Sequence, residues 1–185
     1  MPARALKIAV PVFLAAVSCA APQQYDSSLA QTLAYISAAA YCNSSSIENW
    51  DCSHCRNVTG ISRATTVNAT AYDSPVQAYV AQFSSGGIVV SYRGTQSNDG
   101  IAPWIVDLAF FFKNASFPGC DSCELHEGFF AGYRALQPGV AIALSAYNAM
   151  HAPFVHVTGH SLGAAMAEIA AFELVAAGVY YGKVT

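Results

Sequence analysis

The chain has 185 residues, the size of a single domain. Its residues are 54% hydrophobic and only 10% charged, which supplies apolar surface for a core and argues against a disordered chain. The formal net charge is −3, and lysine and arginine do not cluster, so the sequence excludes an electrostatic surface for nucleic acid.

Residues 1–20 have the pattern of a secretory signal peptide. Arg4 and Lys7 give a positive start, residues 8–17 are apolar, and small residues follow at the spacing that a signal peptidase needs. The alternative is a membrane anchor, but a transmembrane helix needs about 20 apolar residues, and this run is shorter and contains Pro11. We therefore expect a secreted, extracellular protein without a transmembrane anchor.

Helical and strand patterns alternate along the rest of the chain. The expected elements are a helix over residues 26–42, a cysteine-bearing loop over 42–60, strands over 76–83 and 88–92, a loop over 93–100, an apolar segment over 101–112, a loop over 114–124, a helix over 129–150 broken at Gln137-Pro138, a strand over 154–158, a helix over 161–178 and the start of another strand over 180–185. Strands alternating with helices indicate an α/β protein.

In a secreted protein the cysteine pattern predicts disulfides. Two C-x-x-C pairs are present, Cys52 with Cys55 and Cys120 with Cys123. They lie too far apart for a zinc ribbon, in which roughly 15–20 residues separate the pairs, and neither has the strand-then-helix context of a thioredoxin-like motif. We expect two local disulfides and neither a metal nor an organic cofactor. Cys42 is left without a partner, or is a reactive thiol.

Four N-x-S/T sequons agree with secretion, because such sites accept glycans on the surface of secreted proteins. They begin at Asn43, Asn57, Asn68 and Asn114. We expect these four positions to lie on the surface.

The pentapeptide Gly159–Gly163 has the G-x-S-x-G pattern of a nucleophile elbow. The motif requires a strand before the serine and a helix after it, and residues 154–158 and 162–174 supply both patterns. The glycines make room for a strained turn that exposes the Ser161 hydroxyl, and the helix start supplies N–H groups for a developing oxyanion. The alternative is a glycine-serine turn without chemistry, and the context favours a nucleophile.

At these positions the chain resembles the fungal class 3 lipase family, which also contains feruloyl esterases. The segments that carry the resemblance are "VTGHSLGAA" of the elbow, "IVVSYRGT" of the oxyanion strand and loop, "CDSCELHEGFFAGY", and "ISAAAYCN" of the first helix. The resemblance covers residues 29–185. It implies an α/β-hydrolase fold, with a mixed, mostly parallel sheet flanked by helices, of which residues 21–185 would form the N-terminal part.

The resemblance also implies roles for single residues. Ser161 would be the nucleophile, and the Leu162 N–H would donate to the oxyanion together with Thr95, through its N–H and its hydroxyl. A serine nucleophile needs a histidine oriented by a carboxylate, and the only carboxylates after Ser161, Glu168 and Glu173, lie in the helix with no histidine beyond them. The family's acid and base follow the point where this chain stops, as does the cysteine that would pair with the one at position 42.

Residues 101–112 follow the oxyanion loop, and the resemblance implies that they form a lid over the active site. The apolar lid side chains would be Ile101, Trp104, Ile105, Val106 and Leu108. The alternative is a buried strand or core helix, because periodicity does not separate the two here.

The sequence therefore predicts a secreted serine carboxylic-ester hydrolase that works through an acyl-enzyme. The main expectation is a triacylglycerol lipase acting on ester or lipid substrate at a lipid–water interface. The alternatives are a feruloyl esterase on the same scaffold and a catalytically inactive fragment or pseudoenzyme. An apolar lid favours the lipase over the feruloyl esterase, and the 185-residue chain by itself is expected to be inactive.

Overall fold

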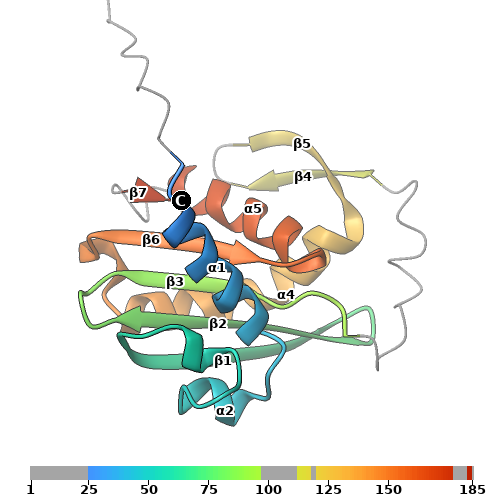
Figure 1. Ribbon diagram of the computed structural model, residues 1–185. Coiled ribbons are helices and arrows are strands. Elements are labelled where there is room, and N and C mark those ends of the chain that lie inside the picture. The colour runs from blue at the N-terminus through green and yellow to red at the C-terminus, as the bar shows by residue number, and fades with distance from the viewer. Residues whose placement is uncertain (1–24, 97–111, 118–119, 177–182, 185) are drawn as a thin grey trace, which may run out of the picture.

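The computed structural model describes residues 25–96, 112–117, 120–176 and 183–184. Within these residues, a five-stranded sheet is covered by helices on both faces, and a two-stranded sheet lies beside it (Figure 1). The layers of helix, sheet and helix give the α/β architecture that the alternating sequence pattern predicts.

The central sheet is mixed, as expected, and its strand order is β1-β2-β3-β6-β7. The first three strands, β1 (Ile61–Ala71), β2 (Ser74–Phe83) and β3 (Ile88–Tyr92), run antiparallel. The last two, β6 (Phe154–Gly159) and β7 (Lys183–Val184), add in parallel to β3. Strand β6 lies between β3 and β7 and runs parallel to both, so the carboxyl ends of these three strands lie at the same edge of the sheet.

Two clusters of buried side chains form the core, one on each face of the sheet. Helix α1 (Ser27–Ala39), the short helix α2 (Ser44–Glu48) and the 3-10 turn η1 (Cys55–Asn57) cover one face, where Tyr79 and Val89 are fully buried. Helices α4 (Glu127–Ala146) and α5 (Leu162–Ala176) cover the other, with the turn η3 (Ala149–His151) between α4 and β6. With both faces covered, β3 is buried along its whole length, which explains its continuous apolar sequence.

The first helix begins where the sequence predicts but ends earlier than predicted. Asp26 caps α1, because its carboxylate accepts the N–H groups of Ser28 and Leu29 at 2.9 and 3.1 Å. The helix ends at Ala39, short of the predicted residue 42, and the chain turns there, since the N–H groups of Tyr41 and Cys42 bond back to Ala38 and Ala39. Tyr41 therefore lies on a turn rather than on the helix.

Two further expectations are wrong. The segment predicted as a loop over 114–124 belongs to an antiparallel hairpin of β4 (Phe112–Phe117) and β5 (Cys120–His126). The predicted break at Gln137-Pro138 is absent, because α4 continues through Pro138. Packing of the apolar α4 face on β1 and β2 outweighs the hydrogen bond that proline removes.

Candidate active site

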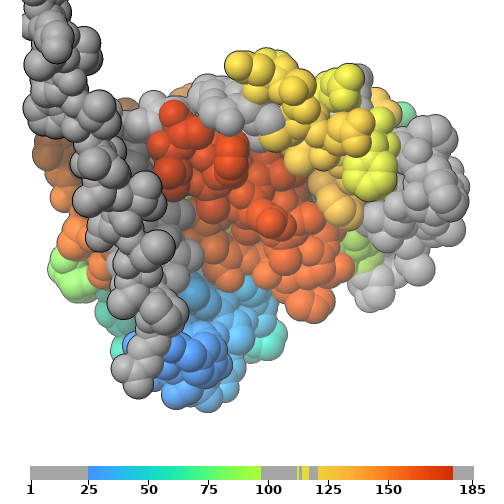
Figure 2. Space-filling model, turned by 90° about the horizontal axis from the view of Figure 1, so that it is seen from above, coloured from blue at the N-terminus to red at the C-terminus, as the bar shows by residue number. Residues whose placement is uncertain are grey.

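Ser161 lies between the end of β6 and the start of α5, and its side chain is exposed. Its φ angle is +57°, in the left-handed region that residues other than glycine seldom adopt. A strained residue of this kind persists only where the surrounding structure holds it, and such residues concentrate at functional sites. Figure 2 shows the region of β6 and α5, coloured orange to red, between the blue α1 and the yellow β5.

The two flanking glycines are needed for close approach. A Cβ atom at Gly159 would overlap the carbonyl of Gly163, and a Cβ atom at Gly163 would overlap the carbonyl of Tyr92 on the neighbouring strand β3. Neither glycine has a positive φ; the residue with the left-handed backbone is Ser161 itself. The elbow is therefore packed directly against β3, and the spacing of the motif follows from two backbone contacts.

Leu162 is the first residue of α5, where helix N–H groups have no partner within the helix. The next two N–H groups, of Gly163 and Ala164, donate to the carbonyls of His160 and Ser161, both at 2.9 Å. Within the described residues the Leu162 N–H makes no hydrogen bond. Its role as an oxyanion donor, which the resemblance implies, stays a prediction.

The loop that carries Thr95 lies against the elbow. A Cβ atom at Gly94 would stand 3.2 Å from the Ser161 Cβ and 2.5 Å from the His160 carbonyl oxygen. Thr95, the next residue, is half-buried and lines a surface cavity of about 870 Å³ together with Gly159 and His160. The structure therefore brings the two predicted sources of oxyanion donors together at the carboxyl end of β6.

A general base for Ser161 is not found among the described residues. His160 precedes the serine, but its Nδ1 is hydrogen-bonded to the Tyr41 hydroxyl at 2.9 Å. No hydrogen bond joins any described histidine to Ser161. The other histidines occupy unrelated positions: His54 in the cysteine loop, His126 against Phe129, His151 bonded to Asn148, and His156 buried in β6.

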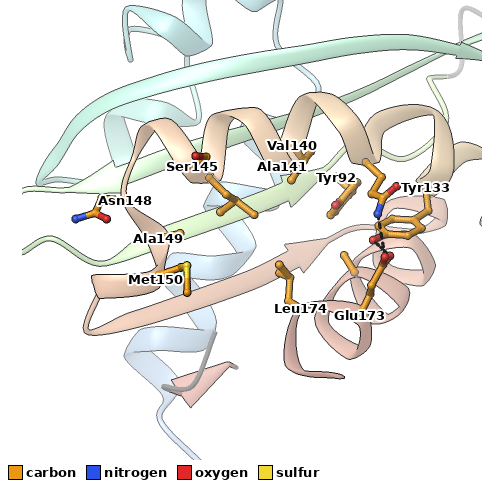
Figure 3. A pocket seen from close by; sticks show the side chains of 13 residues that line it. Tyr92, Tyr133, Val140, Ala141, Ser145, Asn148, Ala149, Met150, Glu173 and Leu174 are labelled. Atoms are coloured by element: carbon orange, nitrogen blue, oxygen red, sulfur yellow. Dashed lines mark hydrogen bonds between the residues drawn. The ribbon is translucent and has the colours of Figure 1, made fainter. Parts of the chain in front are cut away.

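Glu173, one of the two carboxylates after Ser161, is engaged elsewhere. It is buried on α5, where it accepts hydrogen bonds from the Tyr133 hydroxyl and from the Gln137 amide, the latter at 2.9 Å. These groups close one end of an apolar cavity of about 240 Å³ between α4 and α5 (Figure 3). Burial, and then the hydrogen bond to Glu173, raises the pKa of Tyr133. The carboxylate is therefore committed to a helix–helix contact and is not placed to orient a catalytic base.

The cysteines agree with the predicted pattern where they are described. Cys52 and Cys55 form a disulfide, with Cα atoms 4.9 Å apart. Cys123 is also disulfide-bonded, while the side chain of Cys120 lies outside the described part, so that pairing stays a prediction. Cys42 is free, and burial raises the pKa of its thiol.

The remaining predicted positions divide in two groups. All four sequon asparagines, at positions 43, 57, 68 and 114, are exposed. The expected lid residues, at positions 101, 104, 105, 106 and 108, and the expected signal peptide lie outside the described residues. Among the described helices, none has the length and apolar character needed to cross a membrane. The described residues contain no cluster of His, Cys, Asp and Glu that could hold a metal ion.

Sequence reasoning missed Tyr41, which contacts both His160 of the elbow and Gln96 of the loop that carries Thr95. The only signal was its position in "ISAAAYCN", which was interpreted as part of a helix rather than as the turn that follows it.

A strand, a left-handed serine and a helix at the carboxyl edge of a mixed sheet define the α/β-hydrolase fold. Residues 89–183, more than half of the chain, match the family described as Lipase (class 3). The chain belongs to this family.

Individual relatives agree with this assignment. A lipase of Rhizomucor miehei is 35% identical over 68% of this chain and 33% of its own length, and a secreted mono- and diacylglycerol lipase A of Penicillium cyclopium is 31% identical over 52% of this chain and 30% of its own. Among solved structures, a triacylglycerol lipase whose catalytic centre is formed by a serine protease triad has a TM-score of 0.64 at 32% identity, over 83% of this chain and 58% of that one. The chain thus spans about a third of the length of the curated relatives that it matches.

Proposed function

We propose that the protein is a secreted carboxylic-ester hydrolase, a triacylglycerol lipase that acts through an acyl-enzyme on Ser161. The observation that carries this proposal is the left-handed Ser161, exposed at the elbow with the Gly94–Thr95 loop packed against it. The named activities of the relatives support the choice of a lipid ester as substrate.

In this proposal each group has a part in the reaction. The Ser161 oxygen attacks the ester carbonyl carbon and passes its proton to a general base, while the carbonyl oxygen becomes an oxyanion. The Leu162 N–H and Thr95, through its N–H and hydroxyl, would stabilise that charge. The carbon–oxygen bond to the alcohol then breaks and the alcohol leaves with the proton. Water, activated by the same base, attacks the acyl-enzyme and releases the acid and Ser161.

Two alternatives remain distinct from this proposal. A feruloyl esterase would use the same elbow on an aromatic acid ester. A catalytically inactive fragment is favoured by one observation, that no described histidine is hydrogen-bonded to Ser161.

The test compares three substrates in the protein secreted from its complete coding sequence, with the Ser161→Ala variant as control. We expect Ser161-dependent hydrolysis of p-nitrophenyl butyrate, with hydrolysis of emulsified triacylglycerol that rises once droplets form. Rapid cleavage of methyl ferulate with no action on the emulsion would establish the esterase alternative. Failure of Ser161 to react with a fluorophosphonate probe would establish the inactive one.

A further inference from the structure

Tyr41 follows α1, which covers the face of the sheet opposite to α5, and it contacts the nucleophile elbow. Its hydroxyl lies 2.9 Å from the His160 Nδ1, and the two rings meet edge to face with centroids 5.9 Å apart. His160 is the residue immediately before Ser161, so Tyr41 contacts the elbow one residue from the nucleophile.

The same tyrosine also holds the loop of Thr95, on both flanks. Gly94 is in close contact with the Tyr41 side chain, because a Cβ atom at Gly94 would overlap the Tyr41 phenolic oxygen. On the other side of Thr95, the Gln96 side-chain amide donates to the Tyr41 carbonyl oxygen at 3.1 Å. Thr95 therefore lies between one residue in close contact with Tyr41 and one that is hydrogen-bonded to it.

The directions of these hydrogen bonds follow from what each group can do. The Gln96 amide N–H donates to the Tyr41 carbonyl oxygen. Between the Tyr41 hydroxyl and the His160 Nδ1 either atom can be the donor, depending on the imidazole tautomer. Tyr41 is therefore hydrogen-bonded both to the oxyanion loop and to the elbow.

We propose that Tyr41 is a positioning residue that fixes the oxyanion loop against the nucleophile elbow and so sets the separation of Thr95 and Ser161. This role rests on the proposed function, in which Thr95 and the Leu162 N–H share one oxyanion. Thr95 is on a loop beyond β3, while Leu162 is on α5. Tyr41 is hydrogen-bonded to Gln96, the residue after Thr95, and to His160, two residues before Leu162. A small displacement between such donors is costly, because an error of about 1 Å at a reacting group lowers rates by up to about 100-fold.

The hydroxyl can be removed while the ring is kept, in Tyr41→Phe. Oxyanion contacts are made in the transition state and not in the bound ester, so their loss lowers kcat and leaves KM nearly unchanged. We expect kcat for p-nitrophenyl butyrate to fall about ten-fold with KM within about two-fold. Gln96→Ala removes the hydrogen bond from the Gln96 amide to the Tyr41 carbonyl oxygen, and in this variant we expect kcat to fall about two- to three-fold.

Tyr147→Phe is the matched control. Its hydroxyl also makes one side-chain hydrogen bond, to the Thr65 hydroxyl at 2.7 Å, and Thr65 belongs to β1, away from the elbow. It should lose a similar amount of stability and keep kcat. NMR of isotope-labelled protein gives a readout independent of turnover: in Tyr41→Phe the His160 Nδ1 resonance should shift, and Overhauser contacts between residues 94–96 and 160–161 should weaken.

The outcomes separate the two ideas. If the wild type shows Ser161-dependent hydrolysis but Tyr41→Phe is as fast, or both Phe variants slow equally, the positioning role is wrong. If the wild type shows none, the proposed function fails, and the NMR contacts decide the role of Tyr41: their loss in Tyr41→Phe supports it, and their persistence refutes it.

Discussion

At the residue scale, the elbow depends on backbone contacts that leave no room for a side chain. Gly163 sits against the Tyr92 carbonyl, so in Gly163→Ala either α5 or β3 must move. We expect a loss of about 2–3 kcal/mol in the free energy of unfolding, measured by urea denaturation, and loss of fluorophosphonate labelling at Ser161. Gly60→Ala is the comparison, because its Cβ would meet open space and only its φ of +80° is strained. It should cost about 1 kcal/mol and keep the labelling. Normal labelling of a folded Gly163→Ala protein would contradict this account.

Buried tyrosines are expected to lower the stability of the protein at alkaline pH. Burial raises the pKa of Tyr79, Tyr92 and Tyr133, and Glu173 raises the last two further. Above a pH of about 10 the unfolded chain loses these protons while the folded chain keeps them. The stability is therefore fully present below pH ~10 and falls as pH rises beyond it. We expect the urea midpoint to be level from about pH 7 to 9 and to fall by pH 11, with a shallower fall in Tyr92→Phe. An equal fall in both proteins would exclude Tyr92 as a contributor.

At the element scale, α4 carries a proline in its interior. Pro138 is exposed, supplies no N–H, and lies well inside the helix. Pro138→Ala should restore one helix hydrogen bond and raise the free energy of unfolding by about 1–2 kcal/mol, less than the full propensity difference because alanine also loosens the unfolded chain. Thermal unfolding measures the change. Ile142→Ala on the same helix, whose side chain is 72% exposed, should stay within about 0.5 kcal/mol. A destabilised Pro138→Ala protein would show that the packing of α4 is adapted to the proline.

The elements also show where sequence patterns suffice. The elbow was predictable because its motif, strand and helix are adjacent in the chain, and α1 was predictable because Asp26 and its apolar spacing are local signals. Strand β1 was missed because it lies at the sheet edge and alternates polar residues with half-buried ones. The β4–β5 hairpin was missed because its glycine, proline and cysteine indicated a loop. The role proposed for Tyr41 depends on contacts across 53 to 119 positions of the chain, which no local pattern contains.

At the scale of the whole molecule, the long edge strand β1 needs protection from pairing with other chains. Among the described strands it pairs with β2 on one side only. Helix α2 covers part of the other side, where the Glu48 carboxylate accepts the Thr66 N–H at 3.1 Å and Ser44 contacts the Asn68 amide. An unpaired edge is a template for aggregation, and proteins block it with charge or cover. The Thr66 hydrogen bonds lower the pKa of Glu48, so the charge that strengthens this contact is lost only as pH falls through that lowered value.

A glycan on Asn68 would complete the protection, because this asparagine is exposed on β1 itself. Thr70→Ala removes the sequon and keeps Asn68, and Thr59→Ala removes the sequon of Asn57, which lies away from the edge strand. Both secreted variants should lose one glycan by gel mobility, but only Thr70→Ala should aggregate faster than the wild type, by about three-fold or more in light scattering at neutral pH. Lowering the pH through the Glu48 titration should widen the difference, since the edge strand then lacks the Glu48 charge as well as the glycan. Equal aggregation of the two variants would show that the glycans act only through general solubility, and an unchanged glycan count in Thr70→Ala would show that Asn68 is not modified.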